Sequence, residues 1–255
     1  MSRISQFRQR VLGQETLAGT FLKTPHYNLV EVFAQSGFDF LCLDAEHAPF
    51  DRAVIDQCLA VACALDFPVL IRVGDHSPRE ILWALDCGAV GVVVPHVDTV
   101  QVAQDVAQSA RFGLGGRGYA GSSRWGEFAT KSMPDLLEKS QRETVVITQI
   151  EEPYAVPLAS EIAAIDGIDA LFSGPADLSV GMGYDHQNSP ELHAALKFIG
   201  DAAKAHGKGY ASFVPNAQVG REWAEKYGVS MFYVGSEHGF MRSAANAIAD
   251  ALKAD

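Results

Sequence analysis

The chain has 255 residues, of which 48% are hydrophobic and 20% are charged, as is usual for a globular protein. Its formal net charge of −11 argues against nucleic acid or an anionic membrane as a partner. The N-terminus is basic, but no apolar run follows it and no segment is long enough to cross a bilayer, so we expect a cytoplasmic protein. The cysteines form no Cys-x-x-Cys pair and lie in apolar segments, which predicts reduced core thiols at Cys42, Cys58, Cys63 and Cys87.

Short apolar runs alternate with amphipathic segments along the whole chain, which indicates alternating strands and helices. After a leading helix over 3–14, the expected strands are Gly19–Leu22, Phe38–Leu43, Pro68–Val73, Val90–Val94, Thr144–Ile150, Asp169–Phe172, Gly209–Val214 and Met231–Val234. The expected helices are 27–35, 51–65, 78–88, 99–111, 154–165, 190–206, 217–227 and 241–252, with a Gly-rich loop and a further helical patch over 112–142. Eight strand–helix units in one domain, residues 1–255, predict a closed (β/α)8 TIM barrel.

In such a barrel the functional residues lie at the carboxyl ends of the strands. Glu151 and Asp177 each follow a strand, and two converging carboxylates suit a hard divalent cation such as Mg²⁺ or Mn²⁺; two solvated acids at strand ends explain the pattern equally well. Arg72 stands inside a strand, where it forms a structural ion pair or holds an anionic substrate. We see no strand-borne lysine at the mouth, which argues against Schiff-base chemistry. His96 also follows a strand, but a surface position is its simplest interpretation.

Five motifs follow one another in order: Asp44-Ala-Glu-His47, Ile71-Arg72-Val73, Leu85-Asp86-Cys-Gly-Ala89, Gln149-Ile-Glu151 and Gly174-Pro-Ala-Asp-Leu-Ser179. Together they resemble the HpcH/HpaI family of metal-dependent 2-keto acid aldolases. The resemblance implies a divalent metal (Mg²⁺, Mn²⁺ or Co²⁺) and reversible cleavage of a 4-hydroxy-2-keto acid to pyruvate or hydroxypyruvate and an aldehyde, through a metal-stabilised enolate. It further implies a homohexamer, a trimer of dimers that exchange the C-terminal helix.

The resemblance also implies roles for single residues. Glu151 and Asp177 are the expected metal ligands, and His47 is the expected base, with Asp86 fixing its tautomer. Arg72 would donate to the oxygen that gains charge. The expected substrate contacts are Arg72, Gln149, Gly174, the backbone N–H groups of Ala176 and Asp177, and Phe213, while Asp44 and Glu46 support the site from outside.

Two segments depart from the family pattern. Phe112-Gly113-Leu114 stands where the family often has Tyr-Pro-Pro, so contacts of the 112–121 loop with the aldehyde stay open. The last strand ends in Ser236-Glu-His-Gly239, without the usual Asp, and the roles of Glu237 and His238 stay open too. Two alternative functions remain: an acyl-CoA lyase of a related barrel branch, and a catalytically silent barrel that serves in assembly or binding.

Overall fold

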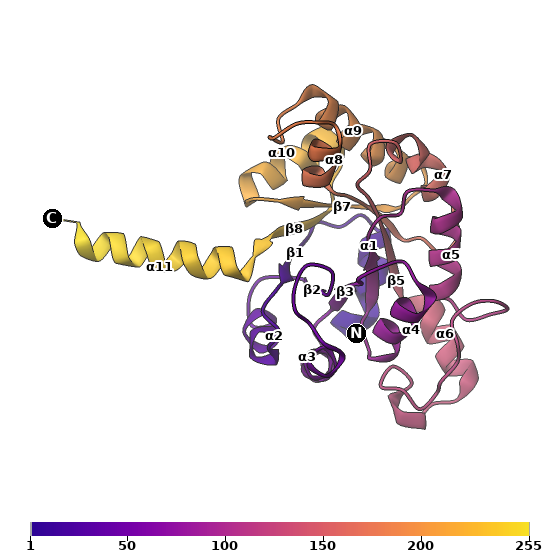
Figure 1. Cartoon of the computed structure of the whole chain (residues 1–255). Helices are drawn as coiled ribbons and strands as arrows, with labels where there is room; N and C mark the ends of the chain where they lie inside the picture. The colour runs from indigo at the N-terminus through magenta and orange to yellow at the C-terminus, as the bar shows by residue number, and fades with distance from the viewer. Residues whose placement is uncertain (1, 255) are drawn as a thin grey trace.

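The computed structural model describes residues 2–254 and contains one closed parallel barrel (Figure 1). Neighbouring strands pair in chain order and β8 closes the sheet on β1. The strands are β1 (Leu17–Leu22), β2 (Phe40–Asp44), β3 (Val69–Arg72), β4 (Gly91–Val94), β5 (Val145–Ile150), β6 (Ala170–Ser173), β7 (Gly209–Val214) and β8 (Met231–Ser236). The predicted (β/α)8 barrel is confirmed.

Helices surround the barrel, as the alternation of the sequence predicts (Figure 1). They are α1 (Arg3–Leu12), α2 (Tyr27–Ala34), α3 (Arg52–Ala64), α4 (Pro78–Asp86), α5 (Val100–Ala110), α6 (Met133–Glu143), α7 (Ala159–Ala163), α8 (Pro175–Gly181), α9 (Pro190–Ala205), α10 (Ala217–Tyr227) and α11 (Glu237–Lys253), with 3-10 turns η1 (Glu127–Ala129) and η2 (Val156–Leu158). The single helix expected over 154–165 is wrong: η2 and a short α7 replace it, because Pro157 has no backbone N–H to donate.

Aromatic side chains fill the barrel interior. The ring of Tyr233 lies 4.9 Å from those of Phe21 and Phe40 and 4.8 Å from that of Phe172, so four strands contribute to one cluster. Below it, α1 closes the end of the barrel at which the strands begin, with Phe7 fully buried against this interior cluster. The interior of the barrel is therefore filled with side chains, and a substrate is expected to bind at the carboxyl ends of the strands.

The four cysteines are free, but they do not share one environment. Cys42 and Cys58 are buried, as expected, whereas Cys87 is half-buried and Cys63 is exposed. The expectation of four core thiols is therefore wrong for Cys63, which lies near the end of α3 where the helix leaves the core. Among residues 2–254, no helix is both long enough and apolar enough to span a bilayer.

The last helix, α11, extends away from the barrel as a separate arm (Figure 1). It begins at Glu237, earlier than the expected residue 241, and Phe240 packs its first turn against Phe33 and Phe38. Further along, the side chains of Ile248 and Leu252 are 64% and 82% exposed. The apolar stripe of this helix does not pack on its own barrel.

Candidate active site

Asp44 and Arg72 form a buried ion pair at the mouth of the barrel. Asp44 ends β2 directly beside Arg72 on β3, and Arg72 donates from Nε and Nη2 to Asp44 at 3.0 and 2.8 Å. The guanidinium also lies 3.2 Å from Glu46 and over the ring of Phe21. Burial alone would raise the pKa of the Asp44 carboxyl, but the charge and hydrogen bonds of Arg72 bring it below its usual value. The pair fixes Arg72 at the mouth.

A lysine also lies at the mouth, contrary to the expectation that none does. Lys23 directly follows β1, and its ammonium Nζ lies 3.2 Å from Asp44 Oδ2. Its backbone N–H and that of Thr24 donate to Glu237, which is buried at the start of α11. Glu237 thus anchors the segment after β1, and Lys23 is placed beside Asp44 as a counter-charge.

Glu151 and Asp177 face each other across Gly174. A Cβ at Gly174 would lie 2.9 Å from Glu151 Oε2, 3.5 Å from Asp177 Oδ2 and only 2.7 Å from Glu151 Cβ. A side chain at residue 174 would therefore displace Glu151, and only glycine leaves room between the two carboxylates. Their convergence, predicted from two parallel strand ends, is observed in the structure.

The surroundings of Glu151 suit a cation. Burial raises the pKa of the Glu151 carboxyl, hydrogen bonds from His96 and Gln149 oppose the rise, and the nearby charge of Asp177 adds to it. The amide of Gln149 donates to Glu151 Oε2, whereas the buried Gln149 Oε1 has no hydrogen-bond partner among the described residues. The two carboxylates carry more negative charge than the neighbouring groups neutralise. Their oxygens therefore fit a divalent metal held by Glu151 and Asp177.

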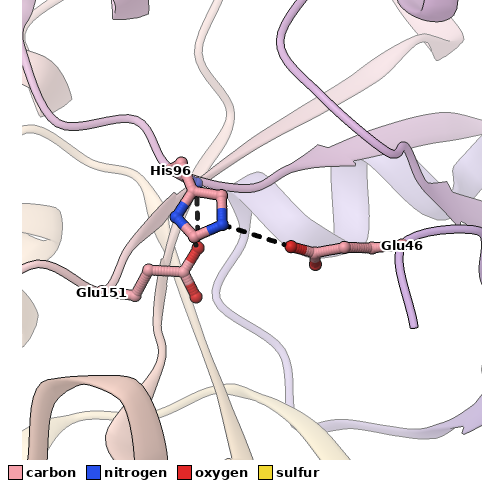
Figure 2. A group of neighbouring side chains, drawn as sticks. All are labelled: Glu46, His96 and Glu151. Carbon is pink, nitrogen blue, oxygen red and sulfur yellow. Dashed lines mark hydrogen bonds and ion pairs between the residues drawn. The ribbon is translucent and has the colours of Figure 1, made fainter. Parts of the chain in front are cut away.

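His96 takes part in this site, which its sequence position did not lead us to expect. Its backbone N–H donates to Glu151 Oε1 at 2.9 Å, and its Nε2 lies 3.4 Å from Glu46 Oε1 (Figure 2). Its Nδ1 lies 2.7 Å from Glu152 Oε1. The hydrogen bond to Glu152 raises the pKa of His96, burial lowers it, and the charges of Glu151 and Glu46 add to the rise. The surface position is correct, since the ring is 58% exposed, but the ring is also bound to the acids of the site.

The structure does not bring His47 and Asp86 together within one chain. His47 follows β2 at the mouth, where its backbone N–H donates to Asp44. Asp86 is the last residue of α4, which runs back from β3 toward the start of β4, so it lies at the opposite end of the barrel. There its carboxylate accepts a hydrogen bond from the buried Arg117. The expected His–Asp pair is therefore not an intrachain contact.

The segment 112–132 also lies at this opposite end. Arg117 stands between the rings of Phe112 and Trp125, 4.8 and 4.6 Å away, and the N–H of Trp125 donates to the backbone of Asp86. A cavity of about 680 Å³ opens beside it between α1, α3 and α6. Its charged lining is largely paired, as Lys139 is with Glu127. The 112–121 loop therefore makes no contact with the mouth of its own barrel.

The remaining predicted residues lie around the mouth. Gly174 is buried, whereas Ala176 and Asp177 are exposed in the first turn of α8. Phe213 near the end of β7 is half-buried and packs against the barrel-interior cluster. The mouth thus combines the carboxylates, Arg72 and Lys23 with the aromatic rings of Phe21 and Phe213.

Comparison with known proteins agrees with this geometry. The HpcH/HpaI aldolase/citrate lyase family model matches residues 17–248. The 5-keto-4-deoxy-D-glucarate aldolases of Enterobacter sp. (strain 638) and Klebsiella pneumoniae are 34% and 33% identical to this chain, over 98% of it and 97% of each relative. A solved HpcH/HpaI aldolase/citrate lyase family protein from Burkholderia cenocepacia J2315 superposes with a TM-score of 0.91 at 28% identity, covering 98% of this chain and 100% of that one. The chain therefore belongs to the HpcH/HpaI aldolase/citrate lyase family.

Proposed function

We propose that this protein is a divalent-metal-dependent aldolase that reversibly cleaves a 4-hydroxy-2-keto acid to pyruvate or hydroxypyruvate and an aldehyde. The observation that carries the proposal is the pair of carboxylates, Glu151 and Asp177, flanking Gly174 beside the Arg72–Asp44 ion pair. Membership of an aldolase family supports the same reaction class. We expect Mg²⁺, Mn²⁺ or Co²⁺ as the metal, held by the two carboxylates.

A divalent cation in this position polarises a 2-keto group and so acidifies C3. The residues of the chain supply the rest. Arg72, held by Asp44 and Glu46, donates to the oxygen of the substrate on which charge develops. The backbone N–H groups of Ala176 and Asp177 bind the carboxylate of the keto acid, while Gln149 orients water beside Glu151. Phe213 lies on the aldehyde side of the mouth.

His47 is the proposed base, because an imidazole on an exposed strand end removes a proton near neutral pH. An Asp86 that orients this ring has to come from a second copy of the chain, since each chain holds the two residues at opposite ends of its barrel. The 112–132 segment packs on Asp86 and would then reach the same neighbouring mouth.

This arrangement is tested by mixing two inactive variants. His47→Ala and Asp86→Ala each slow the exchange of pyruvate methyl protons in D₂O, and the two variants unfolded, mixed and refolded together regain part of the activity. Exchange is measured by proton NMR without an aldehyde present. A mixture no more active than its parts refutes a shared site, and full exchange by His47→Ala alone shows that another group is the base.

The assembly proposed is a homohexamer, a trimer of dimers that exchange α11. Most of the stability of a helix in a protein comes from the packing of its apolar face, and on α11 the apolar residues Ile248 and Leu252 are exposed. Covering each of these side chains contributes about 1.5–3 kcal/mol. A second copy of the chain, which carries the same stripe, is the proposed cover.

Disrupting the stripe is expected to break the assembly. Ile248→Glu with Leu252→Glu places charge in the contact and gives smaller particles in light scattering at micromolar concentration. Asn246→Glu, which adds a charge to an exposed polar position of the same helix, is the matched control and leaves the mass unchanged. Parent protein that sediments as a monomer contradicts the hexamer directly.

The reaction itself is tested by adding substrate and metal. The names of the relatives make 5-keto-4-deoxy-D-glucarate the first compound to try, with pyruvate release measured by a coupled dehydrogenase. Chelator is expected to abolish the release and Mn²⁺, Co²⁺ or Mg²⁺ to restore it. Because Lys23 lies at the mouth, borohydride with pyruvate is the decisive control: a trapped adduct on Lys23 refutes the metal mechanism.

The acyl-CoA lyase is the weaker alternative. Binding a coenzyme A thioester requires cations for its phosphates, whereas Lys23 pairs with Asp44 and Arg72 lies against both Asp44 and Glu46, so two carboxylates already balance these two cations. The net charge of −11 speaks against a nucleic-acid partner, because an acidic protein repels the phosphate backbone. Free cysteines support the cytoplasm as the location.

A further inference from the structure

We propose that a second divalent cation binds between Glu46, His96 and Glu151, on the far side of Glu151 from Asp177. The inference rests on the proposed function for the Glu151–Asp177 position and adds a neighbouring one. One ligand atom of each of the three residues lies within 4.8 Å of the other two, and Figure 2 shows the side chains turned toward one another. Asp177 does not belong to this group, so the two positions have different ligand sets.

The two oxygens of Glu151 face different neighbours. Oε2 accepts from Gln149 and lies close to the Gly174 position that Asp177 also borders. Oε1 faces His96, with the ring Nδ1 at 3.2 Å and the backbone N–H at 2.9 Å. A carboxylate oriented in this way can bridge two cations, as carboxylates do in two-metal sites about 3.5–4 Å apart.

The ring of His96 is held as metal-binding histidines are held. A histidine that ligates a metal through one nitrogen usually donates its other ring N–H to a carboxylate, which fixes the tautomer and the ring orientation. Nδ1 lies 2.7 Å from Glu152 Oε1, and the tautomer that carries its proton on Nδ1 donates to this carboxylate and leaves Nε2 free to ligate the ion. The backbone of His96 has a φ of 53°, an uncommon conformation for a residue with a side chain, and this turn directs the ring toward the acids.

The spacing of Nε2 and Glu46 Oε1 fits two ligands of one ion. They lie 3.4 Å apart, which is long for a hydrogen bond but close to the separation of about 3.3–3.6 Å between tetrahedral ligands at 2.0–2.2 Å from a metal. Glu46 Oε2 is directed to Arg72 instead, at 3.2 Å, so Oε1 is the oxygen that faces the ring. A nitrogen ligand favours Mn²⁺, Co²⁺ or Zn²⁺ over Mg²⁺.

Metal stoichiometry of the full chain tests the proposal. In equilibrium dialysis the parent protein binds two Mn²⁺ or Co²⁺ ions per chain and one Mg²⁺. His96→Ala and Asp177→Ala each bind one Mn²⁺, and His206→Ala, which removes an exposed imidazole beyond α9, still binds two. Glu152→Gln, which alters only the orienting contact, weakens one of the two sites by about 10–100-fold.

Spectroscopy identifies the ligand independently of activity. Pulsed electron paramagnetic resonance of the Mn²⁺ protein detects imidazole nitrogen in the parent and in Asp177→Ala, and not in His96→Ala. One Mn²⁺ per chain without nitrogen coupling overturns the second position and leaves the aldolase proposal standing. Two ions with nitrogen coupling in a protein that cleaves no 4-hydroxy-2-keto acid would support the second position and refute the proposed function.

Discussion

Glu151→Gln and Asp177→Asn are each expected to lower kcat by on the order of 10³-fold or more, because the cation that we propose these carboxylates hold would contribute several kcal/mol to the reaction. Added Mn²⁺ does not restore either variant. Burial raises the pKa of Glu151, so the metal-free fold gains nothing from its charge. Glu151→Gln therefore keeps the metal-free Tm and loses the rise in Tm that Mn²⁺ gives the parent.

The control for this experiment is Asp185→Asn, which removes the same charge from an exposed residue beyond α8. It is expected to keep both the activity and the effect of Mn²⁺ on Tm. Activity of Glu151→Gln that responds to Mn²⁺ as the parent does means that Glu151 is not a ligand. A fall in the metal-free Tm that matches the loss of activity assigns Glu151 to the fold instead.

Arg72→Met is expected to have the next largest effect, and on two measurements at once. Lys23 is then the only cation that remains beside the fully buried Asp44, so the free energy of unfolding falls by about 3–5 kcal/mol. It also removes a donor at the mouth, which lowers kcat by about 10²–10³-fold. The two effects separate in the double variant Asp44→Asn with Arg72→Met, which recovers much of the stability and none of the activity.

Denaturant unfolding and steady-state kinetics give both quantities. Activity that returns with stability in the double variant would assign Arg72 to the fold alone.

The Asp44–Arg72 pair also makes the stability of the fold depend on pH. Because the pKa of Asp44 is below its ordinary value of 3.8, the pair stabilises the fold at neutral pH, and this contribution is lost as the pH falls below about 4. Asp44→Asn removes that dependence.

Much of this architecture follows from the sequence alone. Eight short apolar runs separated by helical segments leave few topologies other than a closed barrel, and the parallel strands bring Glu151 and Asp177 to one end. The predicted fold and family are confirmed. The pairing of His47 with Asp86 within one chain failed because a helix after a strand returns to the other end of the sheet, which places Asp86 at the wrong end.

Other features depend on local geometry that residue patterns do not encode. Lys23 reaches Asp44 because β1 ends at Leu22, so the next residue stands at the mouth; the end of the predicted strand is the sequence signal for this position. His96 reaches Glu46 and Glu152 through a left-handed turn that a non-glycine residue rarely adopts. With the same sequence but an ordinary negative φ at His96, the imidazole would point elsewhere on the surface and would not contact Glu46 and Glu152.

The position of α1 constrains the order in which this chain folds. Arg8, near the start of the chain, pairs with the buried Asp169, and Val11 packs against Gly209 on β7. During synthesis, the helix emerges long before either partner exists, and β1 waits for β8 before the sheet closes. Contacts this far apart in sequence slow folding, because a long loop has to close before they form. The nascent chain therefore carries the β8-facing edge of β1 unpaired and the apolar face of α1 uncovered for most of its synthesis, which is when it is most exposed to aggregation and to capture by chaperones.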